Sequence, residues 1–395
     1  MVERPPAAAG PGGVYVHIPF CSRRCSYCDF ATVAGRDDAM GPYLDALHKE
    51  IGSYQPGAPD TVDTIFFGGG TPSRLSGEQI AALIEAVGAR FHVLEGAEIT
   101  LESNPEDLTR ESLDAIAEAG VNRLTVGIQS LDNQVLQGVG RGHDGDQALQ
   151  AVSRARDAGI GQVAVDLIAG LPGEDKEQWT DTLRRIIALK PDHVSVYLLE
   201  TDKDTPMTRS MRSGRTAFPA DDDLADAWEE TTDFLESAGY PQYEISNFAL
   251  SVPGEADRVS RHNLKYWQDH PYAGFGLGAH GYHQGERRGN RRDLDGYIAD
   301  LAAGRDPVAE QDPWHPVRRL EEALFMGLRL TNGIDSAWIG ERYGLDLQDR
   351  YRTVWEEAEA RSLLSRKGAR IRLTRRGRLQ SNVVFGALIG HLPLE

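Results

Sequence analysis

All three cysteines of this 395-residue chain lie in one short stretch, as Cys21, Cys25 and Cys28. Their spacing is C-x3-C-x2-C, and they follow directly on the apolar run from Val14 to Phe20. Three thiolates on one loop can each bind one iron of a cubane cluster, because iron–sulfur clusters are held by cysteine sulfurs. A [4Fe–4S] cube needs four ligands, and the chain has no fourth cysteine. The fourth iron is therefore open or carries another ligand.

Two other uses of the cysteines fit less well. An odd number of cysteines in a chain without a signal peptide disfavours a disulfide framework. A structural zinc site takes four ligands and usually has paired C-x2-C knuckles. The cysteine loop is therefore predicted to bind a cluster.

The composition is typical of a globular protein, with 40% hydrophobic and 26% charged residues. At this length the chain can form two domains, each with its own core. No apolar run approaches the ~18 residues of a membrane-spanning helix. Residues 1–13 are rich in Pro, Ala and Gly and lack the apolar segment of a signal peptide. We expect a disordered N-terminal tail there and a cytoplasmic protein with reduced thiols.

The net charge of −18 argues against a protein that wraps nucleic acid, since the phosphates require a basic face. Two basic stretches interrupt the acidic sequence, one from Arg287 to Arg292 and one from Arg366 to Arg378. Such stretches are more often solvated surfaces than binding sites. We expect no nucleic-acid partner.

The first half of the chain alternates short apolar runs with amphipathic stretches. Runs rich in Val, Ile and Phe are typical of buried parallel strands, and strands that alternate with helices indicate βαβ units. The predicted strands are Val14–Ile18, Val62–Phe67, Ala97–Leu101, Arg123–Ile128, Gln162–Ile168 and His193–Leu199. The predicted helices cover about 38–54, 76–90, 109–119, 132–158 (where Gly138 and Gly145 allow a break) and 174–189. Thr109 is the expected N-cap of one helix, and Gly120 its end.

Polar or glycine-rich residues accompany the ends of five predicted strands. They are the cysteine loop, the segment Gly68 to Pro72, the segment Leu101 to Glu106, Gln129, and Asp166 with the segment Gly170 to Gly173. The carboxyl ends of parallel strands meet at one edge of a sheet, and in barrels this edge carries the functional residues. The sequence therefore predicts one ligand site at this edge.

Beyond residue 200 the pattern changes. A helix is predicted at about 221–238, and the motif H-N-x-x-Y-W begins at His262. From about 305 to Ser365 the pattern is helical, and Ala369 to Gly377 reads as a strand and turn before a last helix. We divide the chain into a core domain at 14–240, a connecting region at 241–304 and a small, winged-helix-like C-terminal domain at 305–395.

These motifs resemble the radical S-adenosylmethionine (SAM) superfamily, and within it the oxygen-independent coproporphyrinogen III oxidase-like family. The resemblance covers nearly the whole chain. It rests on Tyr-Val-His-Ile-Pro-Phe-Cys from Tyr15, Gly-Gly-Gly-Thr-Pro from Gly68, Gly-Ile-Gln-Ser from Gly127, Val-Gly-Arg-Gly-His from Val139, Asp-Leu-Ile-Ala-Gly-Leu-Pro-Gly from Asp166 and the His262 motif. It implies an α/β fold with a partial (β/α)6 barrel. It also implies a [4Fe–4S] cluster whose open iron is chelated by SAM, which the reduced cluster splits to a 5′-deoxyadenosyl radical.

The resemblance further implies roles for single residues. Cys21, Cys25 and Cys28 would bind the cluster, and SAM would lie against Tyr15, Tyr27, Gly70, Thr71, Glu102, Gln129, Arg141 and Asp166. These residue types suit SAM, whose ammonium and hydroxyl groups bind carboxylates and whose carboxylate binds arginine. His17, in the strand that leads into the cysteine loop, is expected to support the cluster ligands.

One departure from the family pattern separates its members. The oxidases carry a further cysteine two residues after the third, where this chain has Phe30. The relatives without that cysteine are the HemW-type heme chaperones, which also carry H-N-x-x-Y-W. Imidazole binds heme iron and aromatic rings pack on the macrocycle, so we expect His262 to bind heme.

The histidines and aromatic residues of this region can also be structural. His262 is alternatively a hydrogen-bonded loop histidine. Tyr266 and Trp267 are also typical of core residues, and we expect His280 and His283 to be structural.

The leading expectation is therefore a heme chaperone, whose partners are heme and heme-accepting proteins such as respiratory enzymes. The sequence shows no membrane anchor, and an acceptor would bring the protein to a membrane only transiently. The alternative is an oxygen-independent coproporphyrinogen III oxidase, which decarboxylates propionate side chains. A third interpretation is another radical SAM reaction, such as methyl transfer. Since the sequence leaves open whether SAM is cleaved, it does not settle whether the protein is an enzyme.

Overall fold

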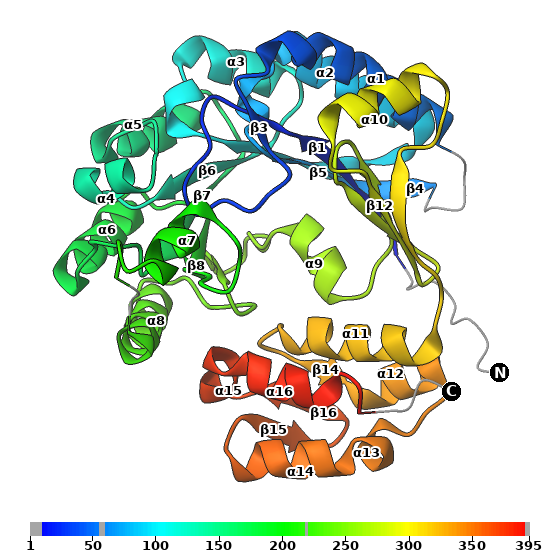
Figure 1. The fold of residues 1–395 in the computed structure, drawn as a ribbon. Coiled ribbons are helices and arrows are strands. Elements are labelled where there is room, and N and C mark those ends of the chain that lie inside the picture. The colour runs from blue at the N-terminus through cyan, green and yellow to red at the C-terminus, as the bar shows by residue number, and fades with distance from the viewer. Residues whose placement is uncertain (1–9, 55–59, 218–219, 392–395) are drawn as a thin grey trace.

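A computed structural model of the chain describes residues 10–54, 60–217 and 220–391, and its larger part is built on one sheet (Figure 1). Six strands of the sheet follow one another in chain order and run parallel. They are β1 (Gly12–Ile18), β4 (Thr61–Gly69), β5 (His92–Ser103), β6 (Arg123–Gln129), β7 (Gln162–Ala169) and β8 (His193–Leu198). All six correspond to predicted strands. The edge strands do not pair with each other, so the sheet is an open, partial barrel.

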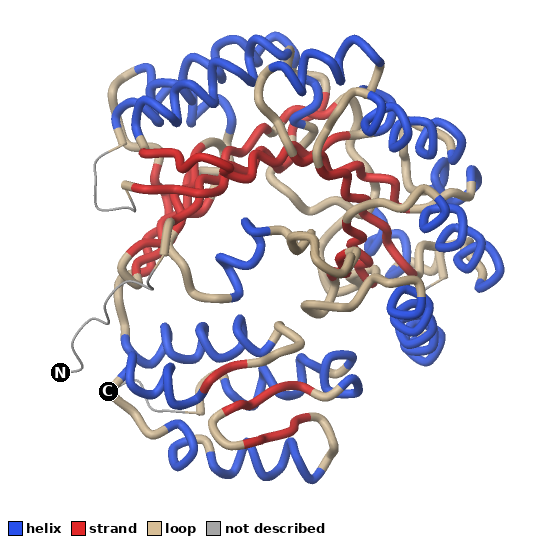
Figure 2. The backbone as a smooth tube through the Cα atoms, turned by 180° about the vertical axis from the view of Figure 1, so that it is seen from behind, coloured by secondary structure: helices blue, strands red, loops and turns tan. Residues whose placement is uncertain are grey.

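Helices cover the outer face of this sheet (Figures 1 and 2). They are α1 (Met40–Ser53), α2 (Gly77–Arg90), α3 (Arg110–Glu118), α4 (Asn133–Gly138), α5 (Gly145–Asp157), α6 (Lys176–Ala188) and α8 (Asp221–Ser237). The short helix α7 (Pro206–Arg212) instead lies next to the cysteine loop, because the backbone N–H of Met207 donates to the carbonyl of Ser26. The predicted helix 132–158 is two helices, because Gly140 takes a φ of +81° and Asp144 starts a new helix with a capping box. Thr109 caps α3 as predicted, and Gly120 follows its end at a φ of +99°.

The two faces of the sheet differ in polarity. On β1, Val14, Val16 and Ile18 are buried in the hydrophobic cluster that includes the helices. Tyr15 and His17 lie between them in the sequence and therefore point to the opposite, concave face. The concave face is thus where polar and aromatic side chains gather.

Further strands extend the sheet beyond β1. β10 (Tyr272–Phe275) pairs with β1 in parallel, and β11 (His280–His283), β12 (Glu286–Asn290) and β13 (Val308–Asp312) continue it antiparallel. At the other edge β9 (Asn247–Ala249) pairs with β8. Because β13 and β14 (Ile334–Asp335) are strands, the prediction of an all-helical stretch from 305 to 365 is wrong there.

The motif that begins at His262 forms the short helix α9 (Arg261–Trp267). In both views α9 lies between the concave face of the sheet and the C-terminal part of the chain (Figures 1 and 2). Glu98 on β5 fixes its start, because the backbone N–H groups of Arg261 and His262 both donate to this carboxylate at 3.0 Å. The helix α10 (Leu294–Ala302) packs instead on α1, outside the sheet.

The C-terminal part has a hydrophobic core of its own, which includes Leu320, Leu324, Trp355 and Ile371. Its elements are α11 (Pro316–Leu328), β14, α12 (Ser336–Tyr343), α13 (Leu347–Arg350), α14 (Arg352–Ala360), β15 (Leu364–Lys367), β16 (Arg370–Leu373), α15 (Arg375–Leu379) and α16 (Ser381–Leu388). The three strands form an antiparallel sheet in the order β14-β16-β15. A helix, a strand, further helices and a hairpin in this order agree with the winged-helix-like prediction. The exact domain bounds stay predictions, and residues 1–9 of the predicted tail lie outside the described residues.

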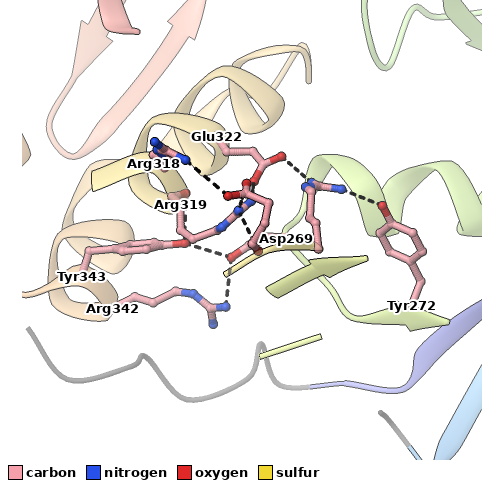
Figure 3. Close-up of polar contacts among 9 residues, drawn as sticks. Asp269, Tyr272, Arg318, Arg319, Glu322, Arg342 and Tyr343 are labelled. Carbon is pink, nitrogen blue, oxygen red and sulfur yellow. Dashed lines mark hydrogen bonds and ion pairs between the residues drawn. The ribbon is translucent and has the colours of Figure 1, made fainter. Parts of the chain in front are cut away.

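A network of charged and phenolic side chains joins the C-terminal part to the rest of the molecule (Figure 3). We call it the ion-pair clamp, and its members are Asp269, Tyr272, Arg287, Asp312, Arg318, Arg319, Glu322, Arg342 and Tyr343. Asp269 accepts from Arg342 at 2.9 Å and from the hydroxyl of Tyr343 at 3.3 Å. Arg287 reaches Glu322 at 2.6 Å. The clamp therefore holds α11 and α12 against β10, β12 and the end of α9.

Among the described residues, no helix is both long and apolar enough to cross a membrane.

Candidate functional site

Cys21 ends β2 (Phe20–Cys21), and Cys25 and Cys28 lie on the loop that leads from it to β3 (Val33–Ala34), a short strand that pairs with β2 in parallel. All three thiols are free; Cys21 is buried, and Cys25 and Cys28 are half-buried. The hydroxyl of Thr71 donates to the sulfur of Cys21 at 3.5 Å, and Arg141 donates to the sulfur of Cys25 at 3.7 Å. Burial raises the pKa of the Cys21 and Cys28 thiols. The hydrogen bond from Thr71 partly opposes the effect of burial on the pKa of Cys21.

Backbone contacts fix this loop at the mouth of the sheet. The backbone N–H of Ser26 donates to the carbonyl of Val139 at 3.0 Å, and the N–H of Met207 donates to the carbonyl of Ser26 at 2.9 Å. Val139 lies between α4 and α5, and Met207 lies on α7. The loop is thus held by segments that follow β6 and β8.

The described residues contain no group of three or more His, Cys, Asp or Glu side chains that converges on a single metal ion. A cubane does not need such convergence, since each thiolate binds a different iron. Three free thiols on one anchored loop, two of them facing donors, fit a cluster held at three corners.

The glycine turn after β4 lies directly against the cysteine strand. A side chain on Gly69, whose φ is +114°, would come within 2.3 Å of the His17 ring. A side chain on Gly70 would come within 2.6 Å of the Pro19 backbone. Only glycine allows this approach, which places Thr71 beside Cys21.

Two carboxylates face the concave side next to the glycine turn. Glu102 on β5 accepts a hydrogen bond from the backbone N–H of Gly69 at 3.0 Å. Burial, reinforced by the charge of Asp166, raises the pKa of Glu102 to about 7. Burial also raises the pKa of Asp166 to about 6, although Ser195 and Arg123 oppose this shift. The mouth therefore holds two carboxyl groups that a cationic or hydroxyl-bearing ligand would stabilise in the charged form.

Arg141 is the cation of the same mouth. It donates to Asn104 at 2.8 Å, to the carbonyl of Gly127 and to the sulfur of Cys25. Burial works against its charge, but Tyr27 and Cys25 outweigh burial and raise its pKa. Its Nε is buried and has no hydrogen-bond partner among the described residues. One donor of a permanently charged guanidinium is thus left for an anionic group.

Gln129 ends β6 in a left-handed conformation, with a φ of +73°. The pairing of β6 with β7 shifts register between Gly127 and Gln129, as at a β-bulge. Strain of this kind in a residue other than glycine is frequent at ligand sites. The bulge places the Gln129 amide next to Gly127 and Arg141.

The predicted tyrosines belong to two different surroundings. The hydroxyl of Tyr15 bonds Nδ1 of His17 at 2.9 Å, and Nε2 of His17 bonds the carbonyl of Ala31 at 2.9 Å. Burial lowers the pKa of His17 to about 4, so the ring is neutral and ties β1 to the far end of the cysteine loop. Tyr27 instead packs against an apolar group that includes Val139 and Met207.

Sequence reasoning missed Asn104. This residue connects two predicted site residues, because its amide nitrogen donates to Thr71 at 3.3 Å and its oxygen accepts from Arg141 at 2.8 Å. The available signal was its position, two residues after Glu102 and directly before a proline at a strand end.

His262 lies apart from the cysteine loop, near the start of β4. It is 1% exposed, and its two ring nitrogens are hydrogen-bonded to Thr64 and to Tyr266, both at 2.8 Å. Phe66 stacks on its ring at 5.2 Å between centroids and on the ring of Tyr15 at 6.1 Å. Burial lowers the pKa of His262 to about 3, so the ring is neutral. His280 and His283 lie on β11, within the extension of the sheet.

The structure therefore brings the predicted cluster and SAM residues together at the carboxyl end of the parallel strands. His262 lies deeper, at the other end of an aromatic column that starts at Tyr15.

Comparisons with known proteins find one family in the larger part of the chain and another in its C-terminal part. The family model of the radical SAM superfamily matches residues 15–186, and that of the HemN C-terminal domain matches residues 315–379. The chain is 35% identical to the heme chaperone HemW of Bacillus subtilis, over 96% of this chain and 99% of the relative. It is 36% identical to the heme chaperone HemW of Mycobacterium tuberculosis (strain H37Rv), over 98% of each.

A mitochondrial relative and a solved structure extend these comparisons. The radical S-adenosyl methionine domain-containing protein 1 of Mus musculus is 35% identical over 84% of this chain and 76% of its own length. The structure of coproporphyrinogen III oxidase (HemN) from Escherichia coli superimposes with a TM-score of 0.84 at 24% identity, over 97% of this chain and 91% of that one. At this identity the superposition shows a shared fold.

Proposed function

The chain belongs to the HemW family of radical SAM proteins, and on that premise we propose that it is a heme chaperone that binds heme and passes it to acceptor proteins. The observation that carries the proposal is the similarity to heme chaperones along almost the whole length of both chains. Phe30 supports it, because this residue stands where the oxidases of the family pattern have a further cysteine.

Membership in the radical SAM family implies a [4Fe–4S] cluster and SAM. We propose that Cys21, Cys25 and Cys28 hold the cluster and that SAM exchanges at its open iron. When bound, this pair supplies one-electron chemistry and a means of cleaving SAM. Thr71 and Arg141 stabilise two of the thiolates by donating hydrogen bonds to them.

The other mouth residues are proposed to position SAM. The unpartnered Nε of Arg141 can donate to the carboxylate of SAM. Glu102 and Asp166 can accept from its ammonium and hydroxyl groups, and Gly70 and the Gln129 amide line the same mouth. Tyr15 and Tyr27 are proposed to lie against SAM as well.

The prediction from the sequence that His262 binds the heme iron stays a prediction. In the structure, binding of iron would require one ring nitrogen to leave Thr64 or Tyr266. The cytoplasmic location and the respiratory acceptors also stay part of the proposal.

The test is anaerobic reconstitution of the protein with iron and sulfide, followed by hemin titration. We expect a Soret band that saturates at one heme per chain and, on addition of a heme-free acceptor protein, is replaced by the Soret band of the heme-loaded acceptor. We expect no turnover of coproporphyrinogen III with SAM and a reductant. Conversion of this porphyrinogen would instead establish an oxidase and refute the chaperone.

A further inference from the structure

A cleft of about 1220 Å³ lies between α9 and the C-terminal part of the chain. It is larger than the pockets of about 300–1,000 Å³ that hold most small ligands, so a macrocycle can fit. From α9 it is lined by Leu264, Trp267 and Gln268, whereas His262 does not line it. The helix therefore turns the last residue of the H-N-x-x-Y-W motif to the cleft and the first to the sheet.

The C-terminal sheet gives one wall of the cleft a positive charge. Ile371 and Leu373 are buried, so Arg370 and Arg372 share the opposite, exposed face of β16. Lys367 lies on the neighbouring strand β15. Within the described residues, none of these three cations pairs with a carboxylate.

The remaining charges of the lining are mostly neutralised. Arg366 pairs with Glu359 at 2.6 Å, and Arg258 pairs with Asp192 and Glu255. Of the acidic residues in the lining, Asp269 pairs with Arg342, Asp335 caps α12 and lies opposite Arg370 in the strand register, and Asp257 is exposed. A surplus of cations in a chain of net charge −18 indicates an anionic ligand.

The opposite wall is aromatic and has unpaired polar atoms. The guanidinium of Arg329 lies over the indole ring of Trp267, 4.4 Å from its centroid, in a cation–π contact. The indole Nε1 is buried and unpartnered among the described residues, as is Nδ1 of His270. Among the described residues no hydrogen bond to the other ring nitrogen of His270 is found, whereas both ring nitrogens of His262 are hydrogen-bonded. Trp338, 48% exposed, adds a second indole to the lining.

We propose that this cleft is the heme site, with the propionates at Arg370, Arg372 and Lys367, the macrocycle against Trp267, and the iron bound by His270. The proposal rests on the proposed function and locates its ligand. Heme matches the cleft in size, in its flat apolar face and in its two carboxylates.

The protonation state of His270 agrees with iron binding. Burial lowers the pKa of His270, and the nearby charge of Lys265 acts in the same direction. The ring is therefore neutral near pH 7, and neutral imidazole is the form that binds iron.

The experiment is a titration of the full chain with hemin and, separately, with iron-free protoporphyrin IX. The variants are His270→Ala and the double variant Arg370→Glu with Arg372→Glu. Matched controls are His92→Ala and Arg376→Glu, which make the same changes at exposed positions outside the cleft. The variant Arg370→Gln with Arg372→Gln serves as a milder form if the charge reversal does not fold, as judged by circular dichroism.

We expect the arginine variants to weaken the binding of both ligands by about tenfold or more, because both ligands lose charge-assisted bonds from the protein to their propionates. We expect His270→Ala to shift the Soret band and to weaken the binding of hemin by about tenfold, but to leave the affinity for the iron-free porphyrin unchanged. The two control variants should bind like the wild type.

Other outcomes would overturn the proposal in distinguishable ways. Wild-type binding of hemin that neither variant changes would place heme elsewhere and leave the chaperone function standing. Loss of the Soret band in His262→Ala, with His270→Ala unaffected, would assign the iron to His262. No binding of hemin by the wild type would refute the proposed function together with the site.

Discussion

Asp269 and Arg342 form the part of the ion-pair clamp that borders the cleft, and their coupling can be measured. Their charged atoms lie 2.9 Å apart, and the two side chains are only 13% and 9% exposed. We predict that Asp269→Ala and Arg342→Met each destabilise the protein and that the double variant loses less than the sum of the two.

The size of the coupling follows from two opposed effects. At 2.9 Å and an effective dielectric constant of ~20, the gross attraction between two unit charges is about 6 kcal/mol. Burial opposes it, and it raises the pKa of Asp269 even though Arg342 acts in the other direction. Since desolvation cancels much of the attraction in buried pairs, we expect a net coupling energy of about 2–3 kcal/mol.

The assay is a double-mutant cycle by urea unfolding, with the wild type, both single variants and the double variant. The matched control is Asp349 with Arg352, a pair at 2.6 Å in the same part of the chain that is 64% and 62% exposed. For this exposed pair we expect a coupling of less than about 1 kcal/mol. Equal coupling in the two pairs, or additive effects for Asp269 and Arg342, would refute the role of burial in the clamp.

Three further predictions concern the candidate site and its supports. The pKa of Glu102 is raised to about 7, so its contribution to stability is present below its ordinary pKa and lost as pH rises through about 7. Glu102→Gln should remove about 2–3 kcal/mol of this loss, measured as urea unfolding free energy from pH 5 to 8.5; an unchanged pH profile would contradict it. Gly69→Ala should displace the His17 ring and prevent cluster reconstitution, monitored by iron and sulfide content, whereas Gly88→Ala, in open space on α2, should not. Thr109→Ala should cost about 1 kcal/mol of stability through loss of a helix cap and leave reconstitution intact.

The parallel part of the fold was predictable because its signals are local. Five of the six strands are short apolar runs and were placed to within two residues of their observed bounds, whereas β5 begins five residues before its predicted start. β10 was not predicted, because Tyr272–Phe275 adjoins the glycine-rich segment and its partner β1 is far away in sequence. Gly274 allows that arrangement, since a side chain there would come within 2.0 Å of the carbonyl oxygen of His280.

The residues of the mouth were predictable from strand ends and motif, but their partners were not. Nothing local indicates that Asn104 joins Thr71 to Arg141. The surroundings of His262 were equally hidden, because Arg261 and Lys265 make α9 look like a surface helix. Lys265 is in fact buried and pairs with Asp63 at 2.5 Å, which holds the helix inside the molecule.

The ion-pair clamp has a consequence for how a large ligand could enter and leave. The two hydrophobic clusters are separate, and charges supply much of the link between them beside the cleft. Salt screens buried ion pairs such as Asp269 with Arg342 much less than exposed ones. Widening the cleft would therefore require breaking these pairs together with the contacts of Glu244 with Arg329 and Leu330 and the packing of Ile245 on the C-terminal core.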